Sequence, residues 1–402
     1  MVECWLPYGD TEVHVSIPLR DLVGVVEPKI GEVIRDVETA VREAAENPIN
    51  CEALSEMAEA SSISIGVDGS LPTETAISAL SGLLGIIEER RGLEDVSIII
   101  GFGLRTRGVG RILKLFRESL PREVEIRGHT AKSETEELGK TRRGTTVRVS
   151  KHLHEGEVRI LIGEFHPDPL AGFKGPHTAI LPQLSGFETI EADRRLHHQG
   201  STGLGVVDDN PILRDSWEAL RLTGVDASLL LVTDHGGGVI DILYGEAEAV
   251  WSEALAEYRN LYSVEVEHAD IYILSPGGGR FDFDLYHSLW ALKALGKPKR
   301  GSWIILVAEC GEGLGAEGLL KLAGVEKLGE LKRRYMLGGD VLHLLRSLQR
   351  VADILLVSTL PTHLAEPLGL EVYRAVNDAF EAAGRGRVLI LPHALSITPR
   401  WG

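Results

Sequence analysis

We predict an α/β fold of two domains with mostly parallel sheets from three features of the sequence. Short apolar runs rich in β-branched residues alternate with segments of helical periodicity along most of the chain, which is typical of strands and crossover helices. The turns after these runs carry glycine or charged residues, as at the ligand-binding edge of doubly wound folds. The length of 402 residues also exceeds what one ordinary hydrophobic core holds.

The first domain is expected to begin with a small β element, because the first 30 residues alternate apolar and polar side chains. After it, the spacing of apolar residues predicts helices and strands in turn. The expected helices are Glu32–Glu46, Glu52–Ala60, Glu74–Arg90, Gly110–Leu120, Asn210–Leu222 and Ala247–Tyr262. The expected strands are Ser62–Val67, Val96–Ile100, Glu123–Ile126, Thr145–Ser150, Val158–Ile162 and Ser228–Thr233.

The strand pattern restarts near residues 263–268, where we place the domain boundary. We therefore expect residues 1–265 and 266–389 to form the two domains. In the second, the strands are expected at Ala269–Leu274, Trp303–Ala308, Ala352–Ser358 and Val388–Leu391, with helices at Asp284–Leu295 and Gly369–Ala383.

The composition argues against a nucleic-acid-binding or membrane protein. With 42 basic and 59 acidic residues the net charge is −17, which repels nucleic acids and anionic membranes but leaves room for a small anionic ligand. No apolar run approaches the roughly 20 residues of a membrane span, and the N-terminus lacks a secretory pattern, so we expect a cytoplasmic protein. The three isolated cysteines indicate neither disulfides nor a thiolate zinc site. Sparse Asn, Gln, Met and Cys beside abundant Glu and Arg are compatible with a thermophilic source.

Several candidate site residues lie in turns that follow predicted strands. Asp68, Arg105, and Asp168 with Lys174 occupy three such turns, and the carboxyl ends of parallel strands line one crevice, so these groups can converge. Glycine runs at 236–238 and 277–279 would let backbone N–H groups approach an anion, or simply allow tight turns. The P-loop and GxGxxG patterns are absent.

A metal site is a second hypothesis for the loop around residue 168. His166 and Asp168 are two residues apart, and with His177 or His197 they would offer imidazole and carboxylate ligands to a divalent ion. The alternative is that these histidines are ordinary surface residues.

The chain resembles the nickel-dependent lactate racemase family over nearly its whole length. The resemblance rests on short phrases in order, namely Asn47–Ile49, Val67–Thr73, Gly144–Val147, Leu170–Phe173, Ala179–Pro182, Gly186–Ile190, Asn210–Ile212, Ala269–Tyr286 and Val307–Cys310. It implies two Rossmann-like domains with the active site in the cleft between them, and a C-terminal tail, 390–402, that packs back on the first domain.

The resemblance also implies a cofactor and a reaction. The family uses a nickel-pincer nucleotide attached through a lysine, and it inverts a 2-hydroxy acid with a base on each side of the substrate. In this chain most of the family's functional positions carry other residues: Thr178 at the tethering lysine, Arg194 at the metal histidine, Arg105 and Asp168 at the two base histidines, Leu71 at a substrate arginine, and His287 and Trp290 at a glutamine and a lysine. Asp68 keeps its residue type.

These substitutions predict an altered site. We expect Asp168, Arg105 and His166 to act in catalysis, and Asp68, Lys174, Arg194 and His287 to bind the ligand or cofactor, with arginines holding a carboxylate or phosphate. Because Thr178 cannot form the tether, the cofactor stays unassigned.

The hypothesis is a divergent racemase or epimerase acting on a 2-hydroxy acid or similar anion. The alternative is a non-catalytic member of the family that binds an anionic ligand or a partner subunit. Both the catalytic and the non-catalytic hypothesis are compatible with a homo-oligomer.

Overall fold

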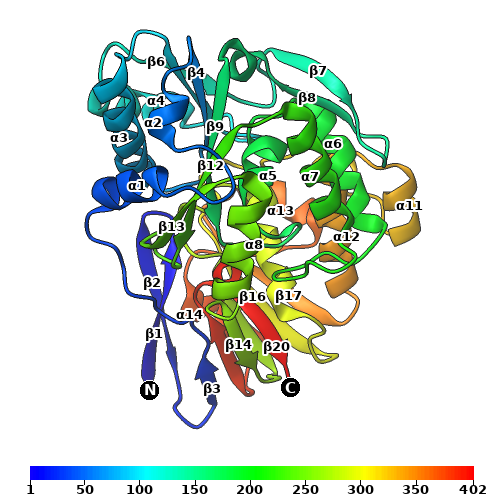
Figure 1. The fold of residues 1–402 in the computed structure, drawn as a ribbon. Coiled ribbons are helices and arrows are strands. Elements are labelled where there is room, and N and C mark those ends of the chain that lie inside the picture. The colour runs from blue at the N-terminus through cyan, green and yellow to red at the C-terminus, as the bar shows by residue number, and fades with distance from the viewer.

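The structure is a computed structural model that describes residues 1–402, and it contains two six-stranded sheets (Figure 1). The first sheet has the order β13-β12-β9-β4-β5-β6, and only the edge strand β13 is antiparallel to its neighbour. Its strands are β4 (Ile63–Asp68), β5 (Val96–Gly101), β6 (Glu125–His129), β9 (Val158–Phe165), β12 (Ala227–Thr233) and β13 (Val239–Gly245). The predicted α/β class with mostly parallel sheets is confirmed.

The second sheet is parallel throughout, in the order β18-β17-β16-β15-β19-β3. Its strands are β3 (Leu22–Val25), β15 (Ile271–Leu274), β16 (Ser302–Val307), β17 (Ala352–Val357), β18 (Glu371–Tyr373) and β19 (Val388–Leu391). Here the structure departs from the expected domain assignment. Residues 1–265 were expected in the first domain, yet β3 hydrogen-bonds with β19 at the edge of the second sheet. A four-residue edge strand carries too little pattern to reveal its partner from sequence.

Helices cover both faces of the first sheet. Helices on one face are α1 (Val37–Glu46), α2 (Leu54–Met57), α3 (Thr73–Arg90) and α4 (Val109–Ser119), and those on the other side include α5 (Pro176–Thr178), α6 (Phe187–Arg195), α7 (Pro211–Thr223) and α8 (Ala247–Tyr258) (Figure 1). The two faces have separate cores: Ile160 and Ile162 of β9 pack with the α1–α4 layer, whereas Leu161 and Phe165 pack on the opposite side. This alternation explains the continuous apolar runs of the central strands.

The two sheets share one core. Leu161 and Leu230 of the first sheet belong to the same buried cluster as Tyr272 and Leu306 of the second. The helices of the second part are α9 (Leu285–Ser288), α10 (Gly318–Lys321), α11 (Leu328–Arg333), α12 (Gly339–Leu348), α13 (Thr362–Ala365) and α14 (Val376–Ala383). The two halves therefore bury a common apolar interior in addition to their own.

The chain termini tie the halves together further. Strands β1 (Val2–Tyr8) and β2 (Thr11–Ile17) form a hairpin whose apolar side packs on the second sheet, and β20 (Thr398–Trp401) pairs in parallel with β14 (Ser263–Val266). Just before β20, Ser396 lies 3.1 Å from the ring of His166 in the first domain. The C-terminal tail thus reaches the loop that follows β9.

Several predicted boundaries were wrong for local reasons. The helix expected from Glu32 begins at Val37, because the Asp36 side chain accepts from the Thr39 N–H and caps it there. The helix expected from Gly369 begins at Val376, since Glu371–Tyr373 instead extend the sheet as β18. The expected strand Thr145–Ser150 is present as β8 (Thr146–Ser150), but it pairs in a hairpin with β7 (Thr135–Lys140), which was not predicted.

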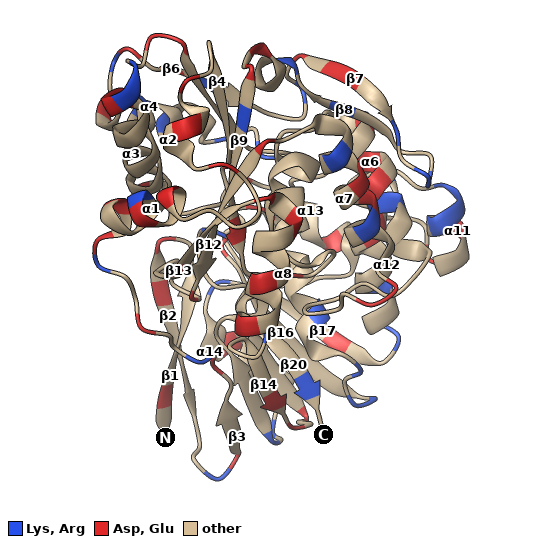
Figure 2. Cartoon of the chain, viewed as in Figure 1, with Lys and Arg blue, Asp and Glu red and all other residues tan.

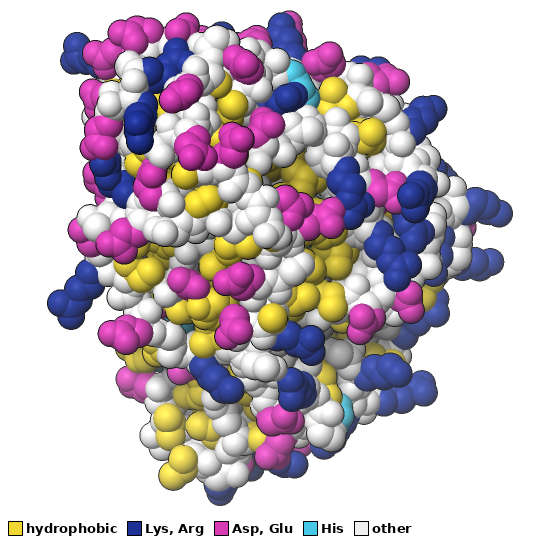
Figure 3. Space-filling model, in the orientation of Figure 1, with side chains coloured by type: hydrophobic (Ala, Val, Ile, Leu, Met, Phe, Trp, Pro, Cys, Tyr) yellow, Lys and Arg dark blue, Asp and Glu magenta, His cyan; other side chains and the backbone are white.

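The charged side chains are distributed unevenly over the surface. Acidic side chains are frequent over α1 to α4, and basic ones gather on the opposite flank around α11 (Figures 2 and 3). None of the helices combines the length and the apolar character that crossing a membrane requires.

Candidate active-site cleft

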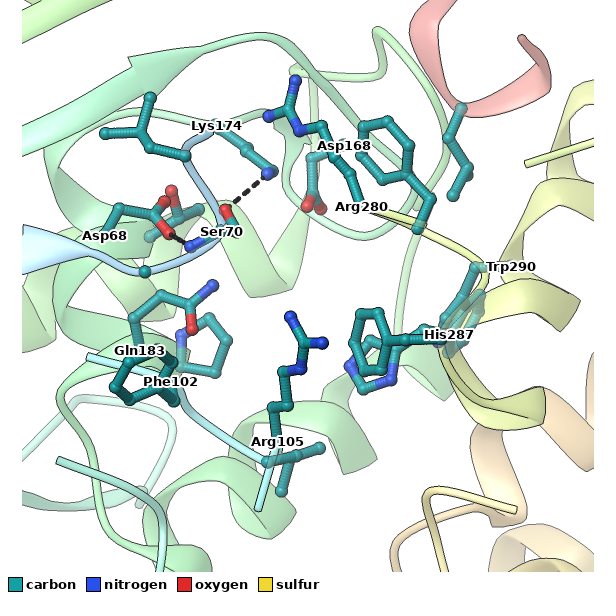
Figure 4. Close-up of a pocket in the computed structure, with 18 of the residues that line it drawn as sticks. Asp68, Ser70, Phe102, Arg105, Asp168, Lys174, Gln183, Arg280, His287 and Trp290 are labelled. Carbon is teal, nitrogen blue, oxygen red and sulfur yellow. Dashed lines mark hydrogen bonds between the residues drawn. The ribbon is translucent and has the colours of Figure 1, made fainter. Parts of the chain in front are cut away.

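The carboxyl ends of both parallel sheets face a cavity of about 440 Å³. The loops after β4, β5 and β9 contribute one wall, and the segment 279–290 after β15 contributes the other (Figure 4). This is where ligands bind in open α/β sheets, because side chains from several loops meet there.

Six of the predicted site residues line this cavity: Asp68, Arg105, Asp168, Lys174, Arg194 and His287. Thr178, Leu71 and Trp290, at three of the substituted family positions, line it as well. The predicted convergence of turn residues therefore holds for this set, while three histidines lie elsewhere.

The most concentrated charge at the cavity wall is centred on Glu164, which is fully buried near the end of β9. Arg280 donates to both carboxylate oxygens at 2.5 and 2.6 Å, and the Lys174 ammonium donates to Oε2 at 3.1 Å. Burial alone would raise the pKa of Glu164, but Arg280 and Lys174 hold it well below the ordinary range. Glu164 is thus a fixed anion that orients two cations toward the cavity.

Asp68 ends β4 and is fully buried. One carboxylate oxygen accepts from the Ser70 N–H at 2.8 Å, and the other has no hydrogen-bond partner within the protein. Burial raises the pKa of Asp68, and Lys174 offsets this only in part. Lys174 also donates to the Ser70 hydroxyl at 2.8 Å (Figure 4). The free oxygen makes Asp68 a candidate ligand contact.

Asp168 is held by the backbone of its own loop. Its Oδ1 accepts from the N–H groups of Leu170 at 2.8 Å and Ala171 at 2.6 Å. These two bonds fix the carboxylate while the side chain stays half-exposed at the cavity. Arg194 approaches the same region from α6, where its guanidinium donates to Asp193 at 3.2 Å.

Arg105 and His287 approach the cavity from different domains. The Arg105 guanidinium donates to Glu312 of the second domain at 2.6 and 3.0 Å and lies 4.6 Å from the centre of the Phe283 ring. The Nδ1 of His287 is 2.8 Å from Asp284 Oδ1, so the N-terminus of α9 fixes the ring. Figure 4 shows both side chains pointing into the space between the domains.

His166 does not line the cavity, contrary to its expected role there. Its ring is fully buried, with Nε2 3.1 Å from Ser396 Oγ and Nδ1 3.0 Å from the Pro167 carbonyl oxygen. Burial lowers the pKa of His166 to about 3, so it is a neutral packing residue between the tail and the Phe281 ring.

The expected metal group around residue 168 is not assembled. His177 is fully buried between Trp217 and Trp251, with ring centroids 4.6 and 5.7 Å away, and burial lowers its pKa to about 3. His197 lies instead with His198 and His343, a group that contains neither Asp168 nor His166. The sequence around His177 is largely apolar, and this was the available signal for a core position. In the structure His177 follows Pro176 in a fully buried stretch.

Sequence reasoning missed Glu164 and Arg280. The strand was expected to end at Ile162, before Gly163, whereas β9 continues to Phe165 and places Glu164 inside the sheet. Arg280 directly follows the glycine run 277–279, which was considered only for its backbone. The available signal in the sequence was a charged residue just after an apolar run, for Glu164, and directly after a glycine run, for Arg280.

The residues present do not fit a lysine-tethered nickel-pincer nucleotide. At the position that the resemblance assigns to the tethering lysine, Thr178 donates its hydroxyl to the Gly175 carbonyl oxygen at 2.9 Å, and it offers no amine. Lys174 is the one lysine that lines the cavity, and acylation of its amine would remove a cation from buried Glu164. The resemblance assigns Arg194 to the position of the metal-binding histidine, and a guanidinium has no lone pair for a metal.

Three comparisons place the chain among known proteins. Residues 8–203 match the family described as the lactate racemase N-terminal domain. A lactate racemase of Thermoanaerobacterium thermosaccharolyticum is 28% identical over 332 residues, covering 80% of this chain and 78% of the relative. A lactate racemase of Lactiplantibacillus plantarum is 24% identical, covering 79% and 77%.

Two solved structures share the fold. The lactate racemase apoprotein from Thermoanaerobacterium thermosaccharolyticum superimposes with a TM-score of 0.85 at 22% identity, over 99% of this chain and all of that one. A crystal structure of a Thermotoga maritima protein gives a TM-score of 0.68 at 14% identity, over 91% and 98%.

Proposed function

The chain belongs to the lactate racemase family, and from this premise we propose that it is a divergent racemase or epimerase. Its substrate is a 2-hydroxy acid or a similar small carboxylate, and it works without a lysine-tethered nickel-pincer cofactor. The observation that carries the proposal is one cavity in which basic side chains of both domains meet the carboxylates of Asp68 and Asp168. A volume of about 440 Å³ suits a small organic anion.

The cations of the cavity supply the substrate's counter-charge. Arg105 presents a planar guanidinium that is already held by Glu312 and Phe283, so little side-chain entropy is lost when it binds a carboxylate. Lys174 and Arg280, fixed by Glu164, support negative charge that develops on the substrate during reaction.

Inversion of a stereocentre needs a proton acceptor and a proton donor on opposite sides. We assign these roles to Asp168 of the first domain and His287 of the second. Asp168 takes the C2 proton, the electron pair of the broken C–H bond moves into the substrate carboxylate, and protonated His287 returns a proton to C2 from the other side. The reverse direction exchanges the two roles, so no oxidant or reductant is consumed.

The test is the Asp168→Asn variant. Asn keeps the oxygen that accepts from Leu170 and Ala171, so the loop should stay intact while the base is lost. We expect the rate of C2–H exchange with D₂O, and of racemisation of single-enantiomer 2-hydroxy acids, to fall at least about tenfold.

The matched control is Asp10→Asn, because Asp10 also lines the cavity but is exposed. Its activity should stay close to that of the unaltered chain. Full activity in Asp168→Asn would remove the assigned base, and with it this form of the proposal.

A second candidate function is a non-catalytic member that binds an anion or a partner subunit. It is favoured by the pairing of the cavity's cations with protein carboxylates: Arg105 with Glu312, Arg194 with Asp193, and both Lys174 and Arg280 with Glu164. This alternative predicts that hydroxy acids or phosphate raise the melting temperature without any exchange or racemisation. Turnover of any such acid would contradict it.

A further inference from the structure

Three histidines from both domains meet outside the cavity. His197 and His198 form a helical turn after α6 in the first domain, and His343 lies on α12 in the second. One ring nitrogen from each lies within 4.8 Å of the other two. The ring centroids of His198 and His343 are 4.8 Å apart, and those of His197 and His198 are 5.3 Å apart.

The imidazoles of this cluster have capacity for a ligand. Both ring nitrogens of His198 are buried and have no hydrogen-bond partner within the protein. All three residues are only partly buried. An unpaired buried polar group is unfavourable, which a bound ion would relieve.

His197 is oriented as metal-binding histidines are. Its Nδ1 lies 2.6 Å from Thr202 Oγ1, and Lys293 fixes the same threonine by donating to its Oγ1 at 3.0 Å and its carbonyl oxygen at 2.8 Å. When Nδ1 donates to Thr202, the lone pair of Nε2 is left for a metal.

Cationic side chains lie near the cluster, namely Lys332, Lys293 and, beside His343, Arg350. Their charge repels a dication, so binding should be weaker than at a site with acidic ligands.

We propose that His197, His198 and His343 form a three-histidine site for a divalent transition-metal ion of the zinc class, which joins the two domains. Zinc sites with three histidines and one open position place nitrogens 2.0 to 2.1 Å from the metal. Their nitrogens are about 3.3 Å apart in tetrahedral geometry, so ring rotations that close the cluster by about 1 to 1.5 Å would complete the site.

The position of the site gives it a structural consequence. The ring of His197 packs edge-on against Trp290 at 5.5 Å, and Trp290 lines the cavity. An ion bound here therefore sits behind the cavity wall and fixes the helical turn Leu196–His198 of one domain to α12 of the other. This is separate from the proposed reaction and does not depend on it.

The experiment uses untagged, chelator-treated full-length protein titrated with Zn²⁺, and with Co²⁺ for its absorption spectrum. We expect one ion per chain, visible Co²⁺ bands of a tetrahedral nitrogen site, and a melting temperature raised by about 2 °C or more at saturating Zn²⁺. His343→Gln should weaken Zn²⁺ binding at least about tenfold and abolish the shift.

The matched control is His363→Gln, which alters an exposed histidine of α13 in the same domain. It should bind Zn²⁺ like the unaltered chain. If His343→Gln does not fold, His198→Gln replaces it, since that residue comes from the other domain. The site would be overturned if His343→Gln or His198→Gln bound Zn²⁺ as tightly as the unaltered chain. Zn²⁺ binding without a rise in melting temperature would overturn the role in joining the domains.

Discussion

Glu164 is the residue on which the charges of the site depend. It is buried in a strand, and it forms ion pairs with Lys174 and Arg280, whose side chains are only 11% and 12% exposed. Removing one member of a buried ion network leaves the others uncompensated, which is more unfavourable than never having formed it. The network therefore places cations at the cavity only as long as Glu164 is ionised.

The variant Glu164→Gln should lower the free energy of unfolding by about 3 kcal/mol at neutral pH, because it leaves two nearly buried cations unpaired. The measurement is denaturant unfolding of both chains. Glu248→Gln is the control, since Glu248 pairs with Arg221 at an exposed site and should change stability by less than about 1 kcal/mol. A loss as small as that of the control would show that Glu164 is not needed to hold the cations.

The pH dependence of this difference follows from the depressed pKa of Glu164. The folded state binds this proton less readily than the unfolded state, so the stabilisation is present above about pH 4.3, the ordinary Glu pKa. It is lost as pH falls from there toward the lower folded pKa. The difference between Glu164→Gln and the unaltered chain should thus be constant near neutral pH and shrink in acid.

The sequence predicted which side chains at the ends of strands line the site, but it did not predict Glu164 and Arg280. Asp68, Arg105 and Asp168 follow apolar runs, so the topology of parallel sheets predicts where they meet. Glu164 and Arg280 could not be found in that way, because their importance comes from pairing across 116 residues of sequence. The burial of His166 and His177 likewise depends on distant partners, the C-terminal tail and two tryptophans.

Among the elements, α7 is the one that positions the Asp168 loop. Its cap, Asn210, accepts from the N–H groups of Ile212 and Leu213 at 3.0 and 3.1 Å. The amide of the same side chain donates to the carbonyl oxygens of Leu170 at 2.7 Å and Val206 at 2.8 Å. One buried residue thus joins a helix N-terminus to the loop that follows β9.

The variant Asn210→Ala should lower the free energy of unfolding by about 2 kcal/mol or more, since it removes a cap and leaves buried carbonyl groups unpaired. It should also reduce activity, because the loop that holds Asp168 loses an anchor. Denaturant unfolding and the C2–H exchange assay measure the two effects.

The control for this prediction is Asp36→Ala, which removes the exposed cap of α1. It should lower stability by about 1 kcal/mol and leave activity unchanged. An equal effect of the two variants on activity would contradict the link between α7 and the loop.

The predicted elements were most accurate for strands that are buried on both faces of a sheet. Central strands such as β5 and β12 were predicted to within a residue, because most of their residues are apolar and consecutive. The β3 edge strand was assigned to the wrong domain, and strand β7 and helices α11 and α12 were not predicted. Their pairing and packing are set by tertiary contacts more than by local pattern.

At the scale of the whole molecule, two mostly parallel sheets present their carboxyl ends to one cleft and share a core. Ion pairs cross that cleft, Arg105 with Glu312 and Arg280 with Glu164. The alternation of strands and helices predicted the α/β class, and the resemblance predicted the cleft between domains. What neither predicted is that the N-terminal segment supplies a strand to the second sheet.

The central claim is our proposal that this chain, which is similar to a lactate racemase over 80% of its length, works without a tethered nickel-pincer cofactor. The most direct test is intact-mass spectrometry with nickel analysis on protein purified from its own host, where any cofactor can be made. We predict the bare chain mass of 43.8 kDa, whether or not a loosely held metal ion is present. A nucleotide-sized added mass together with nickel would contradict the account. It would mean that the chain carries the cofactor although position 178 is a threonine.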